Sequence, residues 1–292
     1  MQIIDFIDFL VNTWILCFLL KYFMEPYRFY GFGGVSSIVD WCTEPLCKRI
    51  RKIISLKTDD DKDLTPFLAI LLLVIARGFL YWATISGAGL ASPIPAFQYS
   101  FIALLSLITK TLTICFIISV LLSKYGVATY SIVLINVIND ISFSIFRGMR
   151  KILKTENLFA LLFSSIMAVI LASGMIYMVL LMKLYLKAAI LFEVGICTDT
   201  LSFFVFVIIV YALMSWVAPD PHNPIVQLIK AIAEPFISIT RRIFPWGNLG
   251  MIDFTPIITV FLIILLKQVI IRIFISLFAV VDAASSTGIP IQ

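Results

Sequence analysis

The segment 234–256 reads Glu234-Pro235, then Arg241-Arg242-Ile243, then Asp253-Phe254-Thr255-Pro256, and it repeats a pattern found earlier in the chain. The earlier copy reads Glu44-Pro45, Arg51-Lys52-Ile53 and Asp63-Leu64-Thr65-Pro66. Each landmark of the second copy follows its counterpart by 190 residues, and Lys267 follows Arg77 by the same distance. A pattern repeated at a fixed offset indicates one structural unit that the fold uses again.

The composition is that of an integral membrane protein. Of the 292 residues, 61% are hydrophobic and 13% are charged, with a mean hydropathy of +1.07. A soluble domain of this length needs more charge to cover its surface. Apolar runs near the ~20 residues that cross a bilayer as a helix predict an all-α protein with six spans, at 5–23, 65–86, 98–122, 157–183, 200–217 and 254–281.

The basic residues predict how the chain is oriented. The three long segments that follow the first, third and fifth spans hold 15 of the 22 Lys and Arg residues. An excess of Lys and Arg marks the cytoplasmic side of a membrane. We therefore expect these three segments to be cytoplasmic and both chain termini to lie outside.

A unit of span, cytoplasmic segment and span returns the chain to its starting side, so the predicted units are parallel rather than inverted. We expect a first unit with a degenerate pattern at 1–97 and a second unit with the full pattern at 196–292. Between them, 98–195 is a two-span region for which an insertion and an eroded third copy of the unit both stay open.

Each cytoplasmic segment carries a narrow polar stripe. In the second copy, polar residues recur in steps of three and four from Gln227 to Arg241 among apolar neighbours, which is typical of an amphipathic helix. The first and middle segments have similar stripes ending near Arg51 and Lys154. We expect three connecting helices that rest in the membrane interface with their basic ends toward anionic head groups. Pro45 and Pro235 should kink these helices or divide them.

The landmarks after each connecting helix predict a helix start. Thr65-Pro66 and Thr255-Pro256 match an N-cap followed by proline at the first helical position. An acidic residue two positions earlier, Asp63 or Asp253, is favourable beside a helix N-terminus. The matched Glu and Arg residues could bind each other, a lipid phosphate or a partner protein.

The second copy resembles the motif of the YggT family, also called YlmG. The resemblance rests on these residues, in this order: Ser215-Trp216, Asn223-Pro224, Glu234-Pro235, Arg241-Arg242, Pro245 and Asp253-Phe254-Thr255-Pro256. The first copy is weaker, with Glu25-Pro26 and Gly33-Gly34 at the first two steps. Both copies lack the proline that precedes the paired basic residues in the family. The middle region, roughly 98–195, falls outside the resemblance.

The resemblance implies a small bacterial inner-membrane or plastid membrane protein without an established catalytic reaction. Members of the family are linked to assembly of membrane complexes, including haem attachment to a cytochrome, to cell division, and to osmotic tolerance. We therefore expect a non-catalytic scaffold or assembly factor of the inner (plasma) membrane, with anionic lipid and a membrane protein or a second copy of the chain as partners.

The sequence contains no catalytic or cofactor-binding constellation. No nucleophile elbow, phosphate-binding glycine loop or zinc-protease helix occurs. The single histidine, His222, lies in a proline-rich turn, and the five cysteines form no metal-binding set with it. The net charge of +5 fits basic loops at a membrane, so no nucleic-acid partner is expected. No metal or other cofactor is expected either.

Basic residues inside the spans support an alternative function. Arg77, Lys110 and Lys267 fall near the middle of predicted spans, where a charge costs at least ~2.5–3.5 kcal/mol on insertion scales. We expect no acidic residue at matching depth, so the counter-charge would come from a partner helix, a lipid phosphate or a transported anion. Snorkelling along a tilted helix is a further possibility. These cations favour, as the alternative, a small-solute or ion channel involved in the osmotic response.

Overall fold

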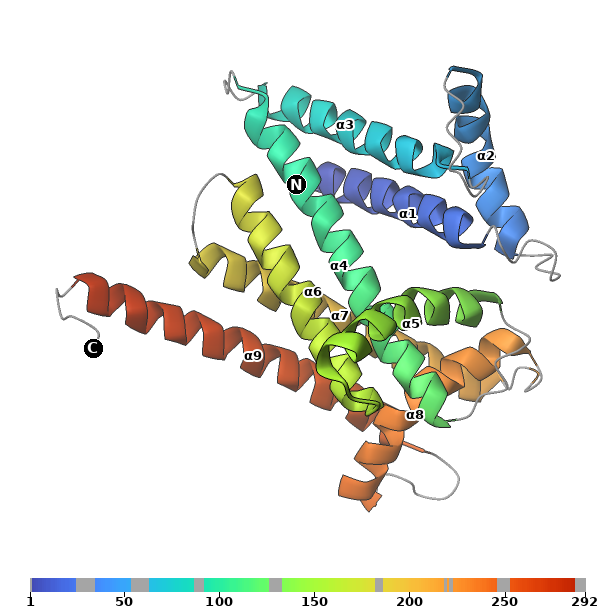
Figure 1. The fold of residues 1–292 in the computed structure, drawn as a ribbon. Helices are drawn as coiled ribbons and strands as arrows, with labels where there is room; N and C mark the ends of the chain where they lie inside the picture. The colour runs from blue at the N-terminus through green and yellow to red at the C-terminus, as the bar shows by residue number, and fades with distance from the viewer. Residues whose placement is uncertain are drawn as a thin grey trace. The chain divides into compact units, whose positions relative to one another are not determined.

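The computed structural model describes residues 2–24, 35–53, 63–86, 92–125, 133–181, 186–217, 220, 223–245 and 253–286. Within these residues the chain forms nine α-helices and no strand (Figure 1). In order, the helices are α1 (Gln2–Met24), α2 (Val35–Ile53), α3 (Thr65–Ser86), α4 (Ile94–Tyr125), α5 (Val133–Leu153), α6 (Leu158–Leu180), α7 (Leu186–Val217), α8 (Pro224–Ile243) and α9 (Thr255–Ser286).

Six of these helices are long and apolar enough to cross a membrane. The candidate spans are Asp5–Met24, Thr65–Thr84, Ile94–Ser123, Leu158–Leu180, Leu186–Met214 and Thr255–Ala279. The expected all-α class is therefore confirmed for the described residues, and the number of candidate spans matches the expected six. The shorter helices α2, α5 and α8 each follow one candidate span and precede the next.

The fifth span begins earlier than its sequence indicates. The expected span was 200–217, but α7 starts at Leu186 and the candidate span runs from there to Met214. Glu193 and Asp199 interrupt the apolar run in this part of the sequence. Each finds a partner on another helix, because Glu193 accepts a hydrogen bond from Ser173 at 2.7 Å and Asp199 pairs with Lys110. Each carboxylate thus has a partner on a neighbouring helix, and α7 continues through both residues.

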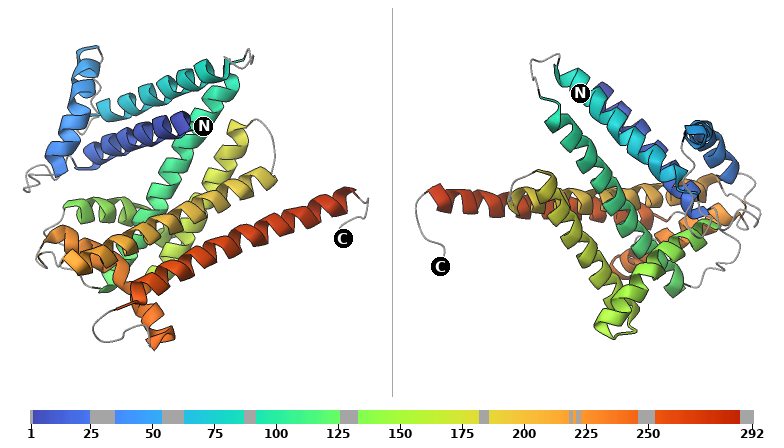
Figure 2. Two further views of the ribbon diagram at one scale, coloured as in Figure 1. Left: turned by 180° about the vertical axis from the view of Figure 1, so that it is seen from behind. Right: turned by 45° about the horizontal axis from the view of Figure 1, so that its top comes forward.

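The chain divides into two compact units, Met1–Ile108 with Val133–Val137, and Thr109–Ile132 with Ile138–Gln292. In the first unit, α1, α2 and α3 pack against one another, and α1 lies beside α3 in both sets of views (Figures 1 and 2). Their common core contains Ile15 and Phe18 of α1, Cys47 and Ile50 of α2, and Val74 of α3. Phe101 and Leu104, in the first part of α4, cover this core.

The second unit contains two packed groups of helices. The helices α7, α8 and α9 pack pairwise, as α1, α2 and α3 do in the first unit. In the other group, the later part of α4 supplies Phe116 and Val120, α5 supplies Phe146 and α6 supplies Leu161 to one buried cluster. Both groups thus place a short helix against two longer ones.

The prolines inside the connecting helices do not divide them. Pro45 lies within the continuous helix α2, and Pro235 lies within the continuous helix α8. Of the two predicted outcomes, a kink or a division, the division does not occur, because one continuous helix includes each proline. A proline inside a helix removes one backbone donor and crowds the preceding turn. In agreement with this, α8 changes direction partway along its length in Figures 1 and 2.

Candidate functional site

An arginine held between two carboxylates joins the end of α2 to the start of α3. Arg51 Nη1 lies 3.0 Å from Glu44 Oε1, and Arg51 Nε donates to Asp63 Oδ2 at 2.8 Å. Glu44 also accepts a hydrogen bond from Lys21 Nζ of α1, and Lys21 Nζ lies 3.1 Å from Asp40 Oδ1. The Lys21 side chain is only 11% exposed, so carboxylates replace most of its water. These five residues form the first ionic cluster.

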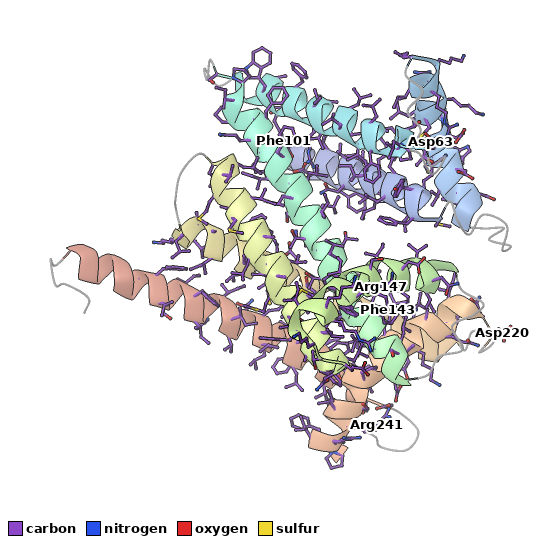
Figure 3. All side chains as sticks on the ribbon, viewed as in Figure 1. Asp63, Phe101, Phe143, Arg147, Asp220 and Arg241 are labelled. Carbon is purple, nitrogen blue, oxygen red and sulfur yellow. The ribbon has the colours of Figure 1, made fainter. Side chains whose placement is uncertain are left out.

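The end of α8 and the start of α9 are joined in the same way. Arg241 Nη2 donates to Asp253 Oδ2 at 2.8 Å, and Arg241 Nη1 lies 3.5 Å from Glu234 Oε1. The hydroxyl of Tyr211, on α7, donates to Glu234 Oε2 at 3.4 Å. These four residues form the second ionic cluster, and Figure 3 labels Arg241 from this cluster and Asp63 from the first.

The two clusters correspond position by position at the offset of 190 residues. The arginine, both of its carboxylates and the residue from the preceding span all match, since Tyr211 follows Lys21 by 190. Lys230 stands where the first copy has Asp40, and Tyr211 stands where it has Lys21. The arginine between two carboxylates is therefore common to both copies, whereas the contribution of the preceding span changes from a cation to a hydroxyl.

The first cluster stabilises the ionised form of its carboxylates. Burial alone would raise the pKa of Glu44, but hydrogen bonds and charge from Lys21 and Arg51 outweigh burial and hold that pKa below its ordinary value. For Asp63, burial again acts to raise the pKa, while hydrogen bonds from Thr65 and Arg51 lower it more strongly. Both groups therefore carry their negative charge at neutral pH.

Asp253 in the second cluster behaves as Asp63 does. Burial acts to raise its pKa, and hydrogen bonds from Thr255 and Arg241 bring that pKa below the ordinary value. The hydrogen bond to Asp253 is in turn the main cause that raises the pKa of Arg241. The pair is thus fully charged, which makes its hydrogen bond a charge-assisted one.

The aspartates, rather than the threonines, cap the helices that follow. Asp63 Oδ1 accepts from the backbone N–H of Thr65 at 2.9 Å, and Asp253 Oδ1 accepts from that of Thr255 at 2.9 Å. Thr65 and Thr255 are the first residues of α3 and α9, and not the N-caps that their sequence predicts. The physical reason is that each aspartate already lies beside the free N–H groups of the helix, where a negative charge is favourable.

Arg77, in the middle of α3, is fully buried among polar groups of the first unit. Its Nη1 donates to Asn12 Oδ1 at 3.0 Å, its Nε to Ser100 Oγ at 3.0 Å, and its Nη2 to the Ser100 carbonyl at 2.5 Å. Asp8 Oδ1 lies 3.8 Å from Nη1 and also accepts a hydrogen bond from Tyr81. Partners on two other helices, α1 and α4, therefore surround this charge.

Lys267 repeats part of this arrangement in the second unit. Its Nζ donates to Ser202 Oγ of α7 at 2.5 Å. Ser202 follows Asn12 by 190 residues, just as Lys267 follows Arg77. Each copy thus joins a mid-span cation on its last helix to a neutral polar side chain on its first helix.

Lys110 has an acidic partner within its own unit. Its Nζ lies 2.5 Å from Asp199 Oδ2, which joins α4 to α7. The expectation that the counter-charge of these cations comes from outside the chain is therefore wrong for Lys110 and for Arg77. Asp199 was placed at the end of a span, whereas the longer α7 puts it near the middle of its candidate span. Asp8 does lie close to the start of its span, and the long arginine side chain reaches it.

The other residues expected to form the site lie at helix starts or within helices. The side chain of Asn223 caps α8 by accepting from the N–H of Ile225 at 2.9 Å, and Pro224 is the first residue of that helix. Pro66 and Pro256 are the second residues of α3 and α9. The side chains of Trp216 and Pro224, and the whole of His222, lie outside the described residues.

The second basic residue of each pair is turned to the outside. Lys52 and Arg242 are exposed, and neither forms a hydrogen bond or ion pair with the described residues. Arg51 and Arg241, directly before them, are occupied within the ionic clusters. The two adjacent cations therefore have different surroundings: one is paired within an ionic cluster, and the other is exposed without a partner among the described residues.

Several residues of these networks were missed from the sequence, chiefly Lys21, Tyr211, Asn12, Ser202 and Ser100. None belongs to a recognisable motif, and each lies in or at the end of an apolar span. The offset of 190 was the available signal, because it also relates Asn12 to Ser202 and Lys21 to Tyr211. Ser100 has no such signal, since it lies in the middle region.

All five cysteines are free thiols. Among the residues that the structure describes, no group of three or more His, Cys, Asp or Glu side chains is arranged to hold a metal ion.

Comparison with known proteins gives a family. The CCB3/YggT family matches residues 1–84 and 192–274, which together are more than half of the chain. Uncharacterized protein PA0392 of Pseudomonas aeruginosa is 34% identical over 92 residues, 32% of this chain and 41% of that protein, so the match spans about two fifths of that relative. No solved structure matches the chain. On the evidence of the two matched segments, the chain belongs to the CCB3/YggT family.

Proposed function

We propose that this protein is a non-catalytic, polytopic scaffold or assembly factor of the bacterial inner membrane. Its connecting helices α2, α5 and α8 lie at the cytoplasmic surface, and both termini lie outside. At the cytoplasmic surface, these helices contact anionic lipid and a partner protein in a membrane complex of the cell envelope, of cell division or of cytochrome assembly. Three parallel units at 1–97, 98–195 and 196–292 present one connecting helix each.

The observation that carries this proposal is that the two residues of each basic pair have different surroundings. Arg51 and Arg241 fix the connecting helix to the start of the next span, while Lys52 and Arg242 stay exposed. A helix held in place by internal ion pairs can present the neighbouring cation at a defined position, which is what a binding surface requires.

Exposed apolar residues next to these cations support an interfacial position. An isoleucine follows each basic pair, and all three are more than half exposed: Ile53 at 82%, Ile152 at 73% and Ile243 at 60%. Exposed apolar side chains beside Lys and Arg are typical of helices that lie at a membrane surface. The same arrangement in all three connecting helices favours one shared orientation.

The mid-span cations support a static framework more than a conduction path. Arg77 has Asn12 and Ser100 as partners, and Lys267 has Ser202. Lys110 has Asp199. Arg77 and Lys110 thus have carboxylates within 4 Å, while Lys267 has a neutral hydroxyl. These contacts weaken one of the two reasons for the channel alternative, and the osmotic links of the family are the other.

Charge reversal at the exposed cations tests the proposal. We expect Lys52→Glu or Arg242→Glu to remove partner proteins from crosslinked pull-downs in native membranes, because the outward charge is inverted while the ionic clusters are kept. Lys187→Glu, an equal charge change on the side predicted to be outside, should leave the partners in place. Partner profiles and cellular phenotypes that stay the same in both exposed variants would contradict the scaffold function.

A further inference from the structure

A cavity of about 370 Å³ lies where α5 ends and α6 begins, in the part of the chain that the family match does not cover. It is lined by Phe143, Phe146, Arg147, Arg150, Glu156, Leu158 and Leu161. Figure 3 shows Phe143 and Arg147 together on α5 at this place. Apolar and cationic side chains thus share one cavity.

A tight turn fixes the basic end of α5 beside the start of α6. Lys154 follows the last residue of α5 with a φ of 51°, and its N–H donates to the Arg150 carbonyl at 2.9 Å. Asn157 then caps α6 by accepting from the N–H of Phe159 at 3.1 Å. The guanidinium groups therefore lie near a helix N-terminus, whose dipole also favours an anion.

The charge at this turn is not balanced as it is in the two ionic clusters. In those clusters the arginine binds one carboxylate seven residues earlier and a second one before the next span. Here Arg150 has the second carboxylate, Glu156, but the residue seven positions earlier is Phe143. Arg147 forms no hydrogen bond or ion pair with any described residue. The lining residues thus supply two cations and one anion, which leaves a positive charge for a ligand to neutralise.

The apolar surroundings define the rest of the ligand. Phe143 contributes an exposed aromatic face to the cavity, and Leu158 lines it from α6. Exposed apolar side chains then follow one turn apart along α6, at Phe159, Phe163, Met167, Leu171 and Met175. An anionic head beside the arginines would have an apolar surface for its tail along the helix.

We propose that this cavity binds the phosphate of an anionic phospholipid, with Arg147 as its main ligand and the acyl chains along α6. Guanidinium groups bind phosphate through paired, charge-assisted hydrogen bonds, and basic pockets beside spans on the cytoplasmic side are suited to anionic lipids. The site deepens the proposed function and rests on it for the membrane position of α5.

Lipid binding to the purified full chain tests this site. Native mass spectrometry of delipidated protein, titrated with phosphatidylglycerol or phosphatidylcholine, gives an apparent affinity for each lipid. We expect the intact chain to prefer phosphatidylglycerol, and Arg147→Gln to weaken that binding by roughly tenfold. Lys187→Gln, an equal charge loss on α7 outside the cavity, should change it by less than about twofold, and Arg147→Lys should retain part of it.

A second variant introduces into this turn the carboxylate that each ionic cluster has and this turn lacks. Phe143→Glu places a carboxylate seven residues before Arg150, as Glu44 and Glu234 stand before Arg51 and Arg241, and it should abolish the preference for phosphatidylglycerol. Equal losses in Arg147→Gln and Lys187→Gln, or equal binding of the two lipids, would overturn the proposal. Glycerol phosphate that competes for the site as strongly as the lipid does would also overturn the proposal. The assay contains no partner protein, so a negative result leaves the pull-down at Lys52 and Arg242 as a separate test of the scaffold function.

Discussion

At the scale of single residues, the same ionic arrangement occurs twice and holds a connecting helix to the next span. Arg241 joins Glu234 of its own helix to Asp253, and Asp253 also caps α9. Exposed ion pairs usually contribute little, about 0.2–1 kcal/mol. These pairs are only about one-third exposed and share one arginine, which favours a larger contribution than an isolated surface pair gives.

Exchanging the charges of one pair measures this contribution. We expect Arg241→Asp alone to destabilise the protein by about 1–2 kcal/mol, because Glu234 and Asp253 then face a third carboxylate. Adding Asp253→Arg should restore part of the loss, since an opposite-charge pair is formed again. The apparent thermal midpoints of the four proteins in detergent give the coupling as a double-mutant cycle.

The neighbouring residue provides the control for that exchange. Arg242→Asp makes the same charge change at an exposed position and should leave the midpoint within about 2 °C of the parent, as surface substitutions usually do. Additive losses in the double variant, or an equal loss in Arg242→Asp, would show that the ionic cluster does not stabilise the fold.

At the scale of elements, a glycine allows α4 to approach α3 where Arg77 is bound. A Cβ atom built on Gly78 would lie 2.6 Å from Cδ1 of Phe97. Two aromatic pairs cross the same contact, Phe79 with Phe97 and Tyr81 with Tyr99. The close approach brings Ser100 of α4 within hydrogen-bonding distance of the buried guanidinium.

Widening this contact should destabilise the first unit. We expect Gly78→Val to lower the apparent thermal midpoint by roughly 2–10 °C, because overpacking costs about 1–3 kcal/mol and displaces Ser100 from Arg77. Gly195→Val is the matched control, since a Cβ at Gly195 of α7 has no atom within 4 Å. Equal midpoints for the two variants would contradict the close approach of α3 and α4.

The elements could largely be predicted from the sequence, since helix-length apolar runs and polar stripes are local signals. The start of α7 could not, because Glu193 and Asp199 look like the end of a span until Ser173 and Lys110 are known to bind them. The continuity of α8 across Pro235 also depends on packing, with Ala233 and Ile237 on either side fully buried.

Only part of the candidate site could be predicted. The repeat identified Glu44, Arg51 and Asp63 with their counterparts, but left open whether they bind each other or an external ligand. The structure shows that they bind each other. Lys21 was missed because the repeat relates it only to Tyr211, a residue of different chemistry, which does not identify it as a partner of Glu44.

At the scale of the whole molecule, we propose that the three connecting helices lie on one side of the membrane. The spans that flank them are long enough to cross a bilayer. Each connecting helix ends in an exposed cation, at Lys52, Lys151 and Arg242, followed by an exposed isoleucine. If these three cations share one side, the chain can present three similar surfaces to the same lipid leaflet and to one partner complex.

Cysteine accessibility at these three positions tests whether the connecting helices share one side of the membrane. In a background without the five native cysteines, Lys52→Cys, Lys151→Cys and Arg242→Cys are each treated with a membrane-impermeant maleimide in intact and in permeabilised cells. Ser92→Cys, at an exposed position between α3 and α4, serves as the outside control. We expect Ser92→Cys to react in intact cells and the other three to react only after permeabilisation. A reaction of any one of the three in intact cells, with the others protected, would contradict it.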